Sequence, residues 1–177
     1  GTVFGSITQN IFANRFPTLV QFNMTHSSGG YFHPDSADTT CALPNVPNSV
    51  EIYSADNNDF RAIDTGAAGS GNIFNITQLT NLTSISLSNN YYLTGAFSIA
   101  ALNVVISSIN ISGTGLSFPA NVANKQSLQS FSGSYNRGLG PLVNLPGTPY
   151  VFDNCTGLSS INLYAASGIS GSRFPIF

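Results

Sequence analysis

Residues 152–163 read FDNCTGLSSINL, and the spacing of their apolar side chains decides the fold. Successive apolar residues in this stretch are three, three, three and two positions apart, and two earlier stretches have the same spacing. The three sets are Phe152, Cys155, Leu158, Ile161 and Leu163; Ile76, Leu79, Leu82, Ile85 and Leu87; and Ala13, Phe16, Leu19, Phe22 and Met24. Such steps are typical of a coil that turns and then enters a short strand, where alternate side chains point inward. Units of about 20 to 30 residues with this pattern predict a solenoid.

Six segments align on the slot that Leu158 occupies, at separations of 28, 35, 24, 22 and 30 residues: Leu19, Pro47, Leu82, Ile106, Leu128 and Leu158. In the second segment only the strand pair Val50 and Ile52 is clearly apolar. The fourth and fifth segments fill the inward slots with Ala100, Asn103, Ile106, Ile109 and Ile111, and with Val122, Lys125, Leu128, Phe131 and Gly133. We therefore expect one shared core in which these strand residues lie above one another: Ile85, Ile109, Phe131 and Ile161.

Polar residues alternate with the inward strand residues in all six segments. The expected outward residues are Gln21, Asn23, Thr25; Ser49, Glu51, Tyr53; Ser84, Ser86, Ser88; Ser108, Asn110, Ser112; Ser130, Ser132, Ser134; and Ser160, Asn162, Tyr164. Alternation across six strands is stronger evidence than apolar spacing alone. It predicts a parallel sheet of short strands with an outer face of hydroxyl and amide groups.

The chain that follows each strand also has a recurring pattern. Residues 89–97, 113–119, 135–142 and 166–175 each place Gly beside an aliphatic residue. Gly permits a left-handed turn away from the sheet, and Asn90 and Asn136 occupy positions where a buried amide can bond the backbone of neighbouring turns. Because no segment combines helical periodicity with caps, we expect loops and short 3-10 turns on the convex side.

These residues resemble the leucine-rich-repeat superfamily. FDNCTGLSSINL is similar to the bacterial surface-protein type of repeat, and LTNLTSISLSNNYYLTGAF (79–97) resembles the plant-type unit, with Asn90 after the strand and Leu93 and Gly95 beyond. The resemblance covers about residues 74–175. It implies a parallel sheet on one face and a binding role, and it brings no catalytic residues.

Composition limits the classes of function. The 177 residues carry a net charge of −2, only 7% are charged, and 38 are Ser or Thr, against a norm of about 25% charged. We expect one mainly β domain that does not bind nucleic acid, because the chain lacks basic character. No apolar run has the roughly 18 residues of a membrane span. A polar, weakly charged surface favours an extracellular, cell-surface or virion-surface location.

The two cysteines, Cys41 and Cys155, are expected to be buried thiols. About four repeats separate them, or about 19 Å at a strand spacing of about 4.8 Å. A disulfide requires Cα atoms within about 7 Å.

The first part of the chain is expected to differ from the rest. Residues 1–45 are interpreted as an N-terminal cap with one degenerate repeat, since a solenoid must cover the open end of its core. Residues 46–177 form the leucine-rich-repeat-like solenoid, continuous with the cap. Within it, residues 54–73 are polar and end in Gly and Ala, which predicts a long surface loop suited to binding.

Catalytic and metal-binding patterns are weak. His33, Asp35 and Asp38 lie in a His-Pro-Asp segment that favours a turn over a metal site. Asp56, Asn58 and Asp59 lack the remaining calcium-loop ligands. His26 has no nucleophile elbow to serve, and Glu51, the only Glu, has no partner carboxylate. We expect no enzyme activity, no cofactor and no metal.

The outer face carries the functional expectation. The candidate ligand-binding residues are Ser84, Ser86, Ser88, Ser108, Asn110, Ser112, Ser130, Ser132, Ser134, Ser160, Asn162, Tyr164 and Tyr53. The first hypothesis is an adhesin or virion-fibre recognition module that binds glycan or protein, with Tyr53 and Tyr164 stacking on sugars. The second is a self-associating subunit of a fibre, shell or filament, because low charge reduces repulsion between copies.

Overall fold

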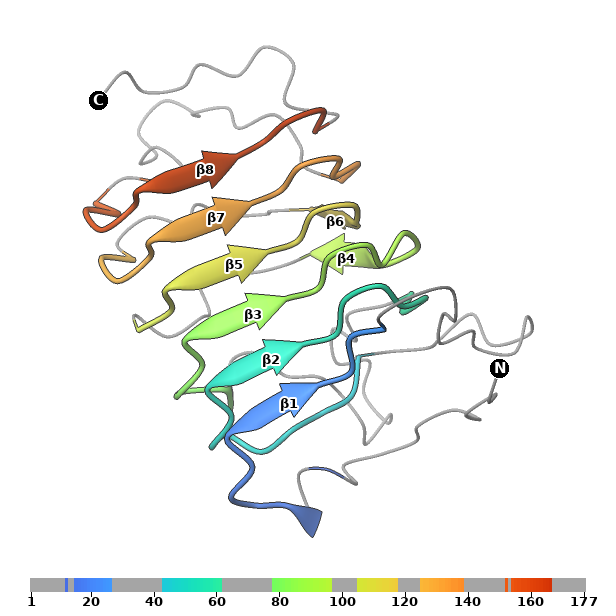
Figure 1. The fold of residues 1–177 in the computed structure, drawn as a ribbon, viewed down its shortest axis with the longest axis vertical. Coiled ribbons are helices and arrows are strands. Elements are labelled where there is room, and N and C mark those ends of the chain that lie inside the picture. Colours follow the sequence, from blue (N-terminus) through green and yellow to red (C-terminus); the bar gives the residue numbers. More distant parts are fainter. Residues whose placement is uncertain are drawn as a thin grey trace.

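The computed structural model describes residues 12, 15–26, 43–61, 78–96, 105–117, 125–138, 152 and 154–166. Over these residues the protein is mainly β (Figure 1). A six-stranded, all-parallel sheet has the order β1-β2-β3-β5-β7-β8. Its strands have three residues each: β1 (Gln21–Asn23), β2 (Ile52–Ser54), β3 (Ser84–Ser86), β5 (Ser108–Asn110), β7 (Ser130–Ser132) and β8 (Ser160–Asn162).

The central residues of the six strands are paired in register and form the core of the sheet: Phe22, Tyr53, Ile85, Ile109, Phe131 and Ile161. The prediction that Ile85, Ile109, Phe131 and Ile161 lie above one another is confirmed. The first five are at most 4% exposed, whereas Ile161 is 38% exposed. Among the described strands, β8, which carries Ile161, has a neighbour on one side only. We call each of these strands, together with its flanking turns, a unit.

The predicted frame of the second unit is wrong. Tyr53 is fully buried and Ile52 is 39% exposed, the reverse of the expected orientation, because the predicted frame is displaced by three residues and an odd displacement exchanges the two faces of a strand. The Tyr53 ring stacks on Phe22, with centroids 4.9 Å apart, and its hydroxyl donates to the carbonyl of Pro44 at 3.1 Å. Val50, not Pro47, precedes the central residue by three positions, as Leu82 precedes Ile85.

Most other inward slots that the structure describes are buried as predicted: Leu79, Leu82, Leu87, Ile106, Ile111, Lys125, Leu128, Phe152 and Cys155. Phe16 is an exception, since it is 52% exposed. Phe12 packs edge-on against Phe22 instead, with ring centroids 5.0 Å apart. The predicted slots at 13, 76, 100, 103 and 122 lie outside the described residues.

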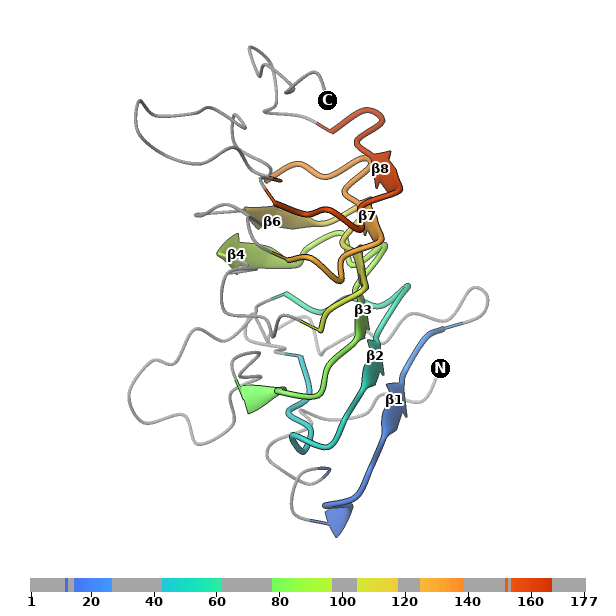
Figure 2. The same cartoon turned by 90° about the vertical axis from the view of Figure 1, so that its left-hand side faces the viewer.

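A second parallel sheet replaces part of the predicted loops on the side opposite the six strands. It consists of β4 (Thr94–Ala96) and β6 (Gly115–Ser117), and Figure 2 shows it across the molecule from the larger sheet. Leu93 and Leu116 are fully buried at these segments. The recurring Gly-aliphatic pattern therefore encodes short strands here as well as turns.

The predicted surface loop at 54–73 is correct only in part over residues 54–61, where the chain leaves the sheet without a further strand but several side chains are buried. Ser54 belongs to β2, and Ala55, Asn58 and Phe60 are at most 1% exposed. Residues 62–73 lie outside the described residues, as does most of the predicted cap at 1–45. The domain boundaries therefore stay a prediction.

Candidate binding face and carboxyl edge

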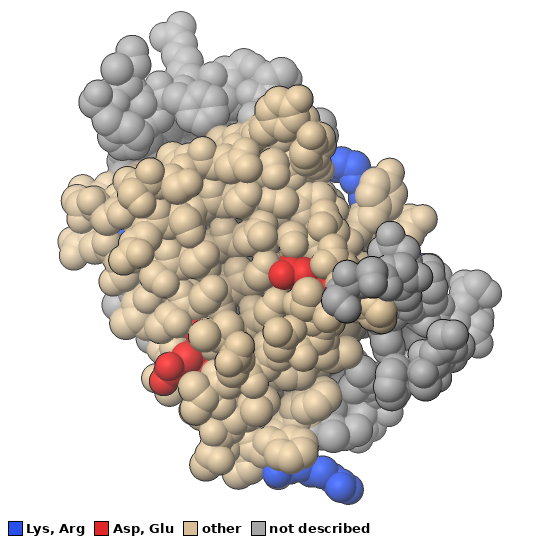
Figure 3. Space-filling view, viewed as in Figure 1, with Lys and Arg blue, Asp and Glu red and all other residues tan. Residues whose placement is uncertain are grey.

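Eight of the predicted binding residues lie together on the outer side of the six-stranded sheet, flanking the buried strand centres: Ser84, Ser86, Ser108, Asn110, Ser130, Ser132, Ser160 and Asn162. We call them the sheet face. Figure 3 shows this side with little charge. The residues of β3, β5 and β7 are half-buried, and those of β8 are exposed. The sequence therefore predicted the composition and the orientation of the face.

Hydroxyl groups on this face bond one another across neighbouring strands. The Ser130 hydroxyl donates to that of Ser108 at 3.0 Å, and the hydroxyls of Ser112 and Ser132 are 2.7 Å apart. A hydroxyl has one hydrogen to donate but two lone pairs. The face is thus held in a fixed arrangement and keeps acceptor capacity for a ligand or for water.

The remaining predicted residues lie in three different surroundings. Ser88 and Ser112 follow their strands and are half-buried, whereas Ser134 is only 8% exposed. Tyr164 is 68% exposed, in the turn after β8. Tyr53 does not belong to the face: it is buried in the core, and this burial raises the pKa of its phenol well above 10.0.

Asp56 is a charged group of the face that the sequence analysis did not assign to it. Its carboxylate accepts hydrogen bonds from the Ser86 hydroxyl and the Ser88 amide, both at 2.6 Å, and from the Ser54 hydroxyl at 3.2 Å. The signal for its position was available, because Asp56 stands three residues after Tyr53 as Ser88 does after Ile85. The wrong frame of the second unit concealed it.

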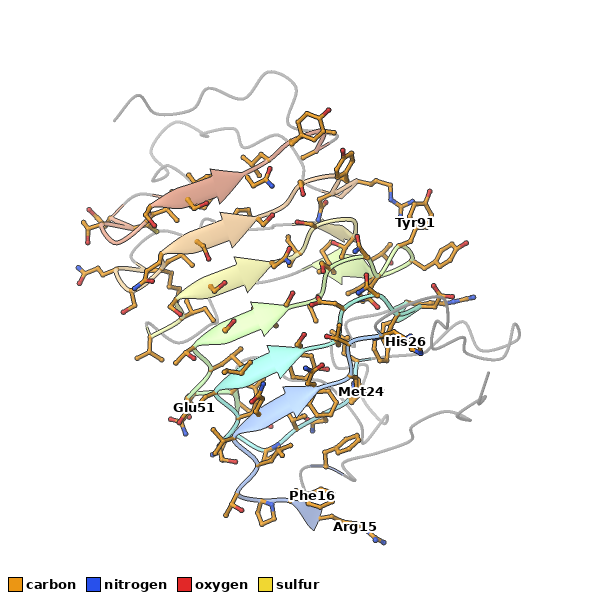
Figure 4. The ribbon with its side chains drawn as sticks, viewed as in Figure 1. Arg15, Phe16, Met24, His26, Glu51 and Tyr91 are labelled. Carbon is orange, nitrogen blue, oxygen red and sulfur yellow. The ribbon has the colours of Figure 1, made fainter. Side chains whose placement is uncertain are left out.

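At the amino edge, where the strands begin, hydroxyl side chains tie several units to the one before. Thr83 donates to the Glu51 carbonyl at 3.0 Å, and Ser107 donates to the Thr83 carbonyl at 2.9 Å. Ser159 donates in the same way to the Gln129 carbonyl at 3.1 Å. Figure 4 shows Glu51 at this edge and Tyr91 at the opposite one.

At the carboxyl edge, where the strands end, buried side-chain amides link neighbouring units. Asn90 donates to the carbonyls of Ala55, in the preceding unit, and Leu87, in its own unit, at 2.8 and 2.9 Å. Asn136 donates to the hydroxyl of Thr114, which occupies the same position one unit earlier, at 2.9 Å. Both amides are fully buried. The predicted bonding role of Asn90 and Asn136 is therefore confirmed.

The residue immediately before this buried position has a left-handed backbone in five units: Asn57, Asn89, Gly113, Tyr135 and Ala165, with φ between 52° and 66°. Asn and Gly adopt this conformation at low cost. At Gly113 an added Cβ would also lie 2.8 Å from Oδ1 of Asn89. Tyr135 and Ala165 are the less usual occupants, and Tyr135 is 59% exposed.

Four exposed tyrosines gather at the carboxyl edge, which we call the tyrosine edge: Tyr91, Tyr92, Tyr135 and Tyr164, each 52 to 68% exposed. They form two edge-to-face pairs, Tyr91 with Tyr92 at 5.1 Å and Tyr135 with Tyr164 at 5.4 Å between centroids. Sequence analysis identified only Tyr164. The adjacent tyrosines at 91 and 92, directly after Asn90, were the available signal.

Two arginines support the first pair of rings. The Arg137 guanidinium lies over the Tyr91 ring, 3.6 Å from its centroid, and donates to the Tyr91 carbonyl. The Arg61 guanidinium lies 5.5 Å from the centroid of Tyr92. A cation over an aromatic face is attracted by the ring quadrupole. Both guanidinium groups therefore restrain the rings that they cover.

Lys125 and Cys155 occupy the same inward slot in neighbouring units, six residues before Phe131 and Ile161. Lys125 is 6% exposed and Cys155 is 8% exposed. Burial lowers the pKa of the Lys125 amine, and the charge of Cys155 acts in the opposite direction. Cys41 lies outside the described residues, so the prediction of two buried thiols stays a prediction.

The weaker sequence candidates do not form a site among the described residues. His26 is exposed beyond β1, and Glu51 is exposed at the amino edge. Over the described ranges no three His, Cys, Asp or Glu side chains gather closely enough to hold a metal ion. His33, Asp35 and Asp38 lie outside these ranges. The same ranges contain no helix that is long and apolar enough to cross a membrane.

The sheet face and the tyrosine edge together offer hydroxyls, amides, one carboxylate and exposed aromatic rings. Comparisons of the chain with family models, with curated proteins and with solved structures gave no match.

Proposed function

We propose that the protein is a non-enzymatic recognition module that binds a glycan or a protein at a cell or virion surface, outside the cell. The observation that carries this proposal is the sheet face, in which hydroxyl and amide side chains from four parallel strands lie side by side. Such groups bond the hydroxyls of sugars and the backbone of proteins. Weak charge makes nucleic acid an unfavourable partner.

We also propose that the units form a solenoid like that of leucine-rich repeats. Three features support it: strands of three residues in unbroken register, buried amides that tie two of the units to the preceding one, and strand centres at residues 22, 53, 85, 109, 131 and 161. A solenoid presents its sheet as an extended binding surface.

A glycan array tests the recognition proposal with the wild-type chain and the variants Ser84→Arg and Ser132→Arg. Each arginine places a long charged side chain on the sheet face, so we expect binding to fall at least tenfold. Ser127→Arg is the matched control, because Ser127 is exposed in a turn before β7. Unchanged binding by both face variants would remove the sheet face from the proposal.

A structural subunit that self-associates is the second candidate, and β8 favours it. All three residues of β8 are exposed, and Ile161 is an apolar side chain on a strand that has one neighbour in the part of the chain that the structure describes. Unpaired strand edges readily accept another strand. Size-exclusion chromatography with light scattering distinguishes the candidates: a concentration-dependent oligomer that Ile161→Lys disperses supports the subunit, and a stable monomer contradicts it.

A further inference from the structure

We infer that the tyrosine edge is the primary subsite of this recognition module and that it binds a neutral oligosaccharide. The inference rests on the proposed function and gives it a ligand class and a position. Tyr91, Tyr92, Tyr135 and Tyr164 supply the apolar ring surfaces, and the adjoining sheet face supplies the polar groups.

The rings are held in place before any ligand arrives. Tyr91 is covered on one side by Arg137, which also donates to the Tyr91 carbonyl. Tyr135 and Tyr164 contact each other edge to face, and the Tyr135 amide donates to the Tyr164 carbonyl at 2.8 Å. Binding surfaces that are already ordered lose less conformational entropy when they bind. These exposed rings therefore have the properties of a preorganised site.

A unit with small residues separates the two tyrosine pairs. At the turn position of Asn89 and Tyr135 it has Gly113, and Gly115 follows two residues later. A Cβ on Gly115 would lie 3.8 Å from Nη2 of Arg137. The Arg137 side chain that covers Tyr91 therefore lies close to this glycine. The rings of Tyr91 and Tyr135 belong to units two strand spacings apart, or about 10 Å. An extended oligosaccharide can contact both pairs, whereas one monosaccharide cannot.

Tyr135 is an unexpected residue for its backbone. It has φ of 53°, where three other units have Asn57, Asn89 or Gly113 and the last has the small residue Ala165. A left-handed conformation costs an L-residue with a bulky side chain about 1 to 2 kcal/mol, and strained residues cluster at functional sites. The strain is not offset by burial, since the ring is 59% exposed. Contact between this exposed ring and a ligand accounts for a tyrosine at this position.

The ligand class follows from the rings and the polar face rather than from the charged groups, because the two guanidinium groups keep their charge over the tyrosine rings and the Asp56 carboxylate offsets part of it. The guanidinium groups of Arg61 and Arg137 lie over tyrosine rings, and Arg137 also bonds a backbone carbonyl. The carboxylate of Asp56 lies on the adjoining face. A pyranose offers an apolar C–H face for stacking and hydroxyls at its rim, which matches an aromatic ring with a polar tip.

The test measures binding of neutral and acidic oligosaccharides to the wild-type chain and to three single variants, Tyr91→Ala, Tyr164→Ala and Tyr164→Phe. We expect each alanine variant to weaken binding of a neutral oligosaccharide about fivefold to tenfold, from the loss of one stacking contact. Tyr164→Phe keeps the ring and should bind within about twofold of the wild type. Phe16→Ala is the matched control, because Phe16 is an equally exposed aromatic residue that lies below β1 in Figure 4, away from the tyrosine edge. Thermal unfolding of every variant verifies that it is folded.

The outcomes separate this inference from the function on which it rests. Loss of binding in the alanine variants alone, with the phenylalanine and Phe16 variants unaffected, supports the inference. Full binding by both alanine variants, together with loss in Ser84→Arg and Ser132→Arg, overturns the tyrosine edge and leaves the recognition module standing. Binding restricted to acidic oligosaccharides overturns the ligand class. A wild-type chain that binds no oligosaccharide overturns the inference, and the function then depends on a protein ligand.

Discussion

Neighbouring units are linked at both the amino and the carboxyl edge of the six-stranded sheet, but by different side chains. At the amino edge, Ser107 uses its single hydroxyl hydrogen to bond the Thr83 carbonyl of the unit before. At the carboxyl edge, Asn90 has two amide hydrogens and bonds carbonyls in its own unit and in the preceding one. The carboxyl-edge link is buried, whereas Ser107 is half-buried.

This difference explains why the candidate site lies at one edge only. At the carboxyl edge the linking amide is enclosed, and turn positions around it link the units through their backbone amides, as Tyr135 does to the Tyr164 carbonyl. Those positions are filled by exposed residues such as Tyr91 and Tyr135. At the amino edge the linking hydroxyls of Thr83, Ser107 and Ser159 lie nearer the surface. The carboxyl edge is therefore freer to carry binding residues.

Loss of one buried amide should have the largest effect on stability. Asn90→Ala leaves the enclosed carbonyls of Ala55 and Leu87 without this donor, so we expect the free energy of unfolding to fall by about 3 kcal/mol. Chemical denaturation measures the change. Asn81→Ala, at an exposed turn, is the control and should stay within about 0.5 kcal/mol of wild type. Equal losses in both variants would contradict the importance of the buried amide.

Replacement of the turn glycine should come second. Gly113→Ala introduces a Cβ at φ of 66° and 2.8 Å from Oδ1 of Asn89, and we expect a loss of about 2 kcal/mol. Gly113→Asn matches the residue at Asn57 and Asn89, so it should lose less than the alanine variant. Thermal unfolding of the two variants decides the order, and a more stable alanine variant would refute the backbone argument.

High pH should destabilise the core between the two edges. Burial raises the pKa of Tyr53, so above about pH 10 the unfolded chain releases a proton that the folded chain retains. The stabilisation that protonated Tyr53 gives to the folded state is fully present below pH 10. Above this pH the free energy of unfolding falls by up to about 1.4 kcal/mol per pH unit. Tyr53→Phe should remove this slope and cost about 1 kcal/mol at neutral pH, through loss of the bond to Pro44. Denaturation between pH 7 and pH 11 measures both effects.

Removal of one amino-edge hydroxyl should have the smallest effect. Ser107→Ala deletes a half-buried hydrogen bond to the Thr83 carbonyl, and we expect a loss of about 1 kcal/mol. Ser127→Ala, at an exposed turn, should change stability by less than about 0.5 kcal/mol. A loss at Ser107 as large as that at Asn90 would remove the proposed difference between the edges.

The sequence predicted the parts of the fold that depend on periodicity. The alternation around Ile85, Ile109 and Phe131 encodes which side of each strand is buried, because inward and outward side chains differ in polarity at every step. The sequence also predicted the position of Asn90 and Asn136 correctly, because each stands five residues after a strand centre, where a buried amide can bond the neighbouring turns. These relationships are local and repeat along the chain.

The second unit could not be placed in this way, because two frames fit its residues. Val50 and Ile52 are apolar and two residues apart, which favoured a frame with Tyr53 outside. The structure instead buries Tyr53, whose hydroxyl is satisfied by the Pro44 carbonyl nine residues earlier. This contact depends on the path of the chain before β2, and no spacing within the strand indicates it.

The tyrosine edge was missed for a related reason. Tyr91 and Arg137 are 46 residues apart, and their contact arises only when the turns of several units are stacked. The sequence shows the residues but not which turns face one another. Binding residues on such turns depend on long-range geometry, whereas the sheet face depends on local alternation.

The unequal intervals between strands have a consequence for protein engineering. Successive strand centres are 31, 32, 24, 22 and 30 residues apart, yet pairing stays in register throughout. Differences in chain length are thus accommodated away from the pairing strands. A foreign peptide inserted between two units, where the length of the chain already varies, should therefore be displayed without altering the hydroxyl rows, which makes the molecule a candidate scaffold for epitope presentation.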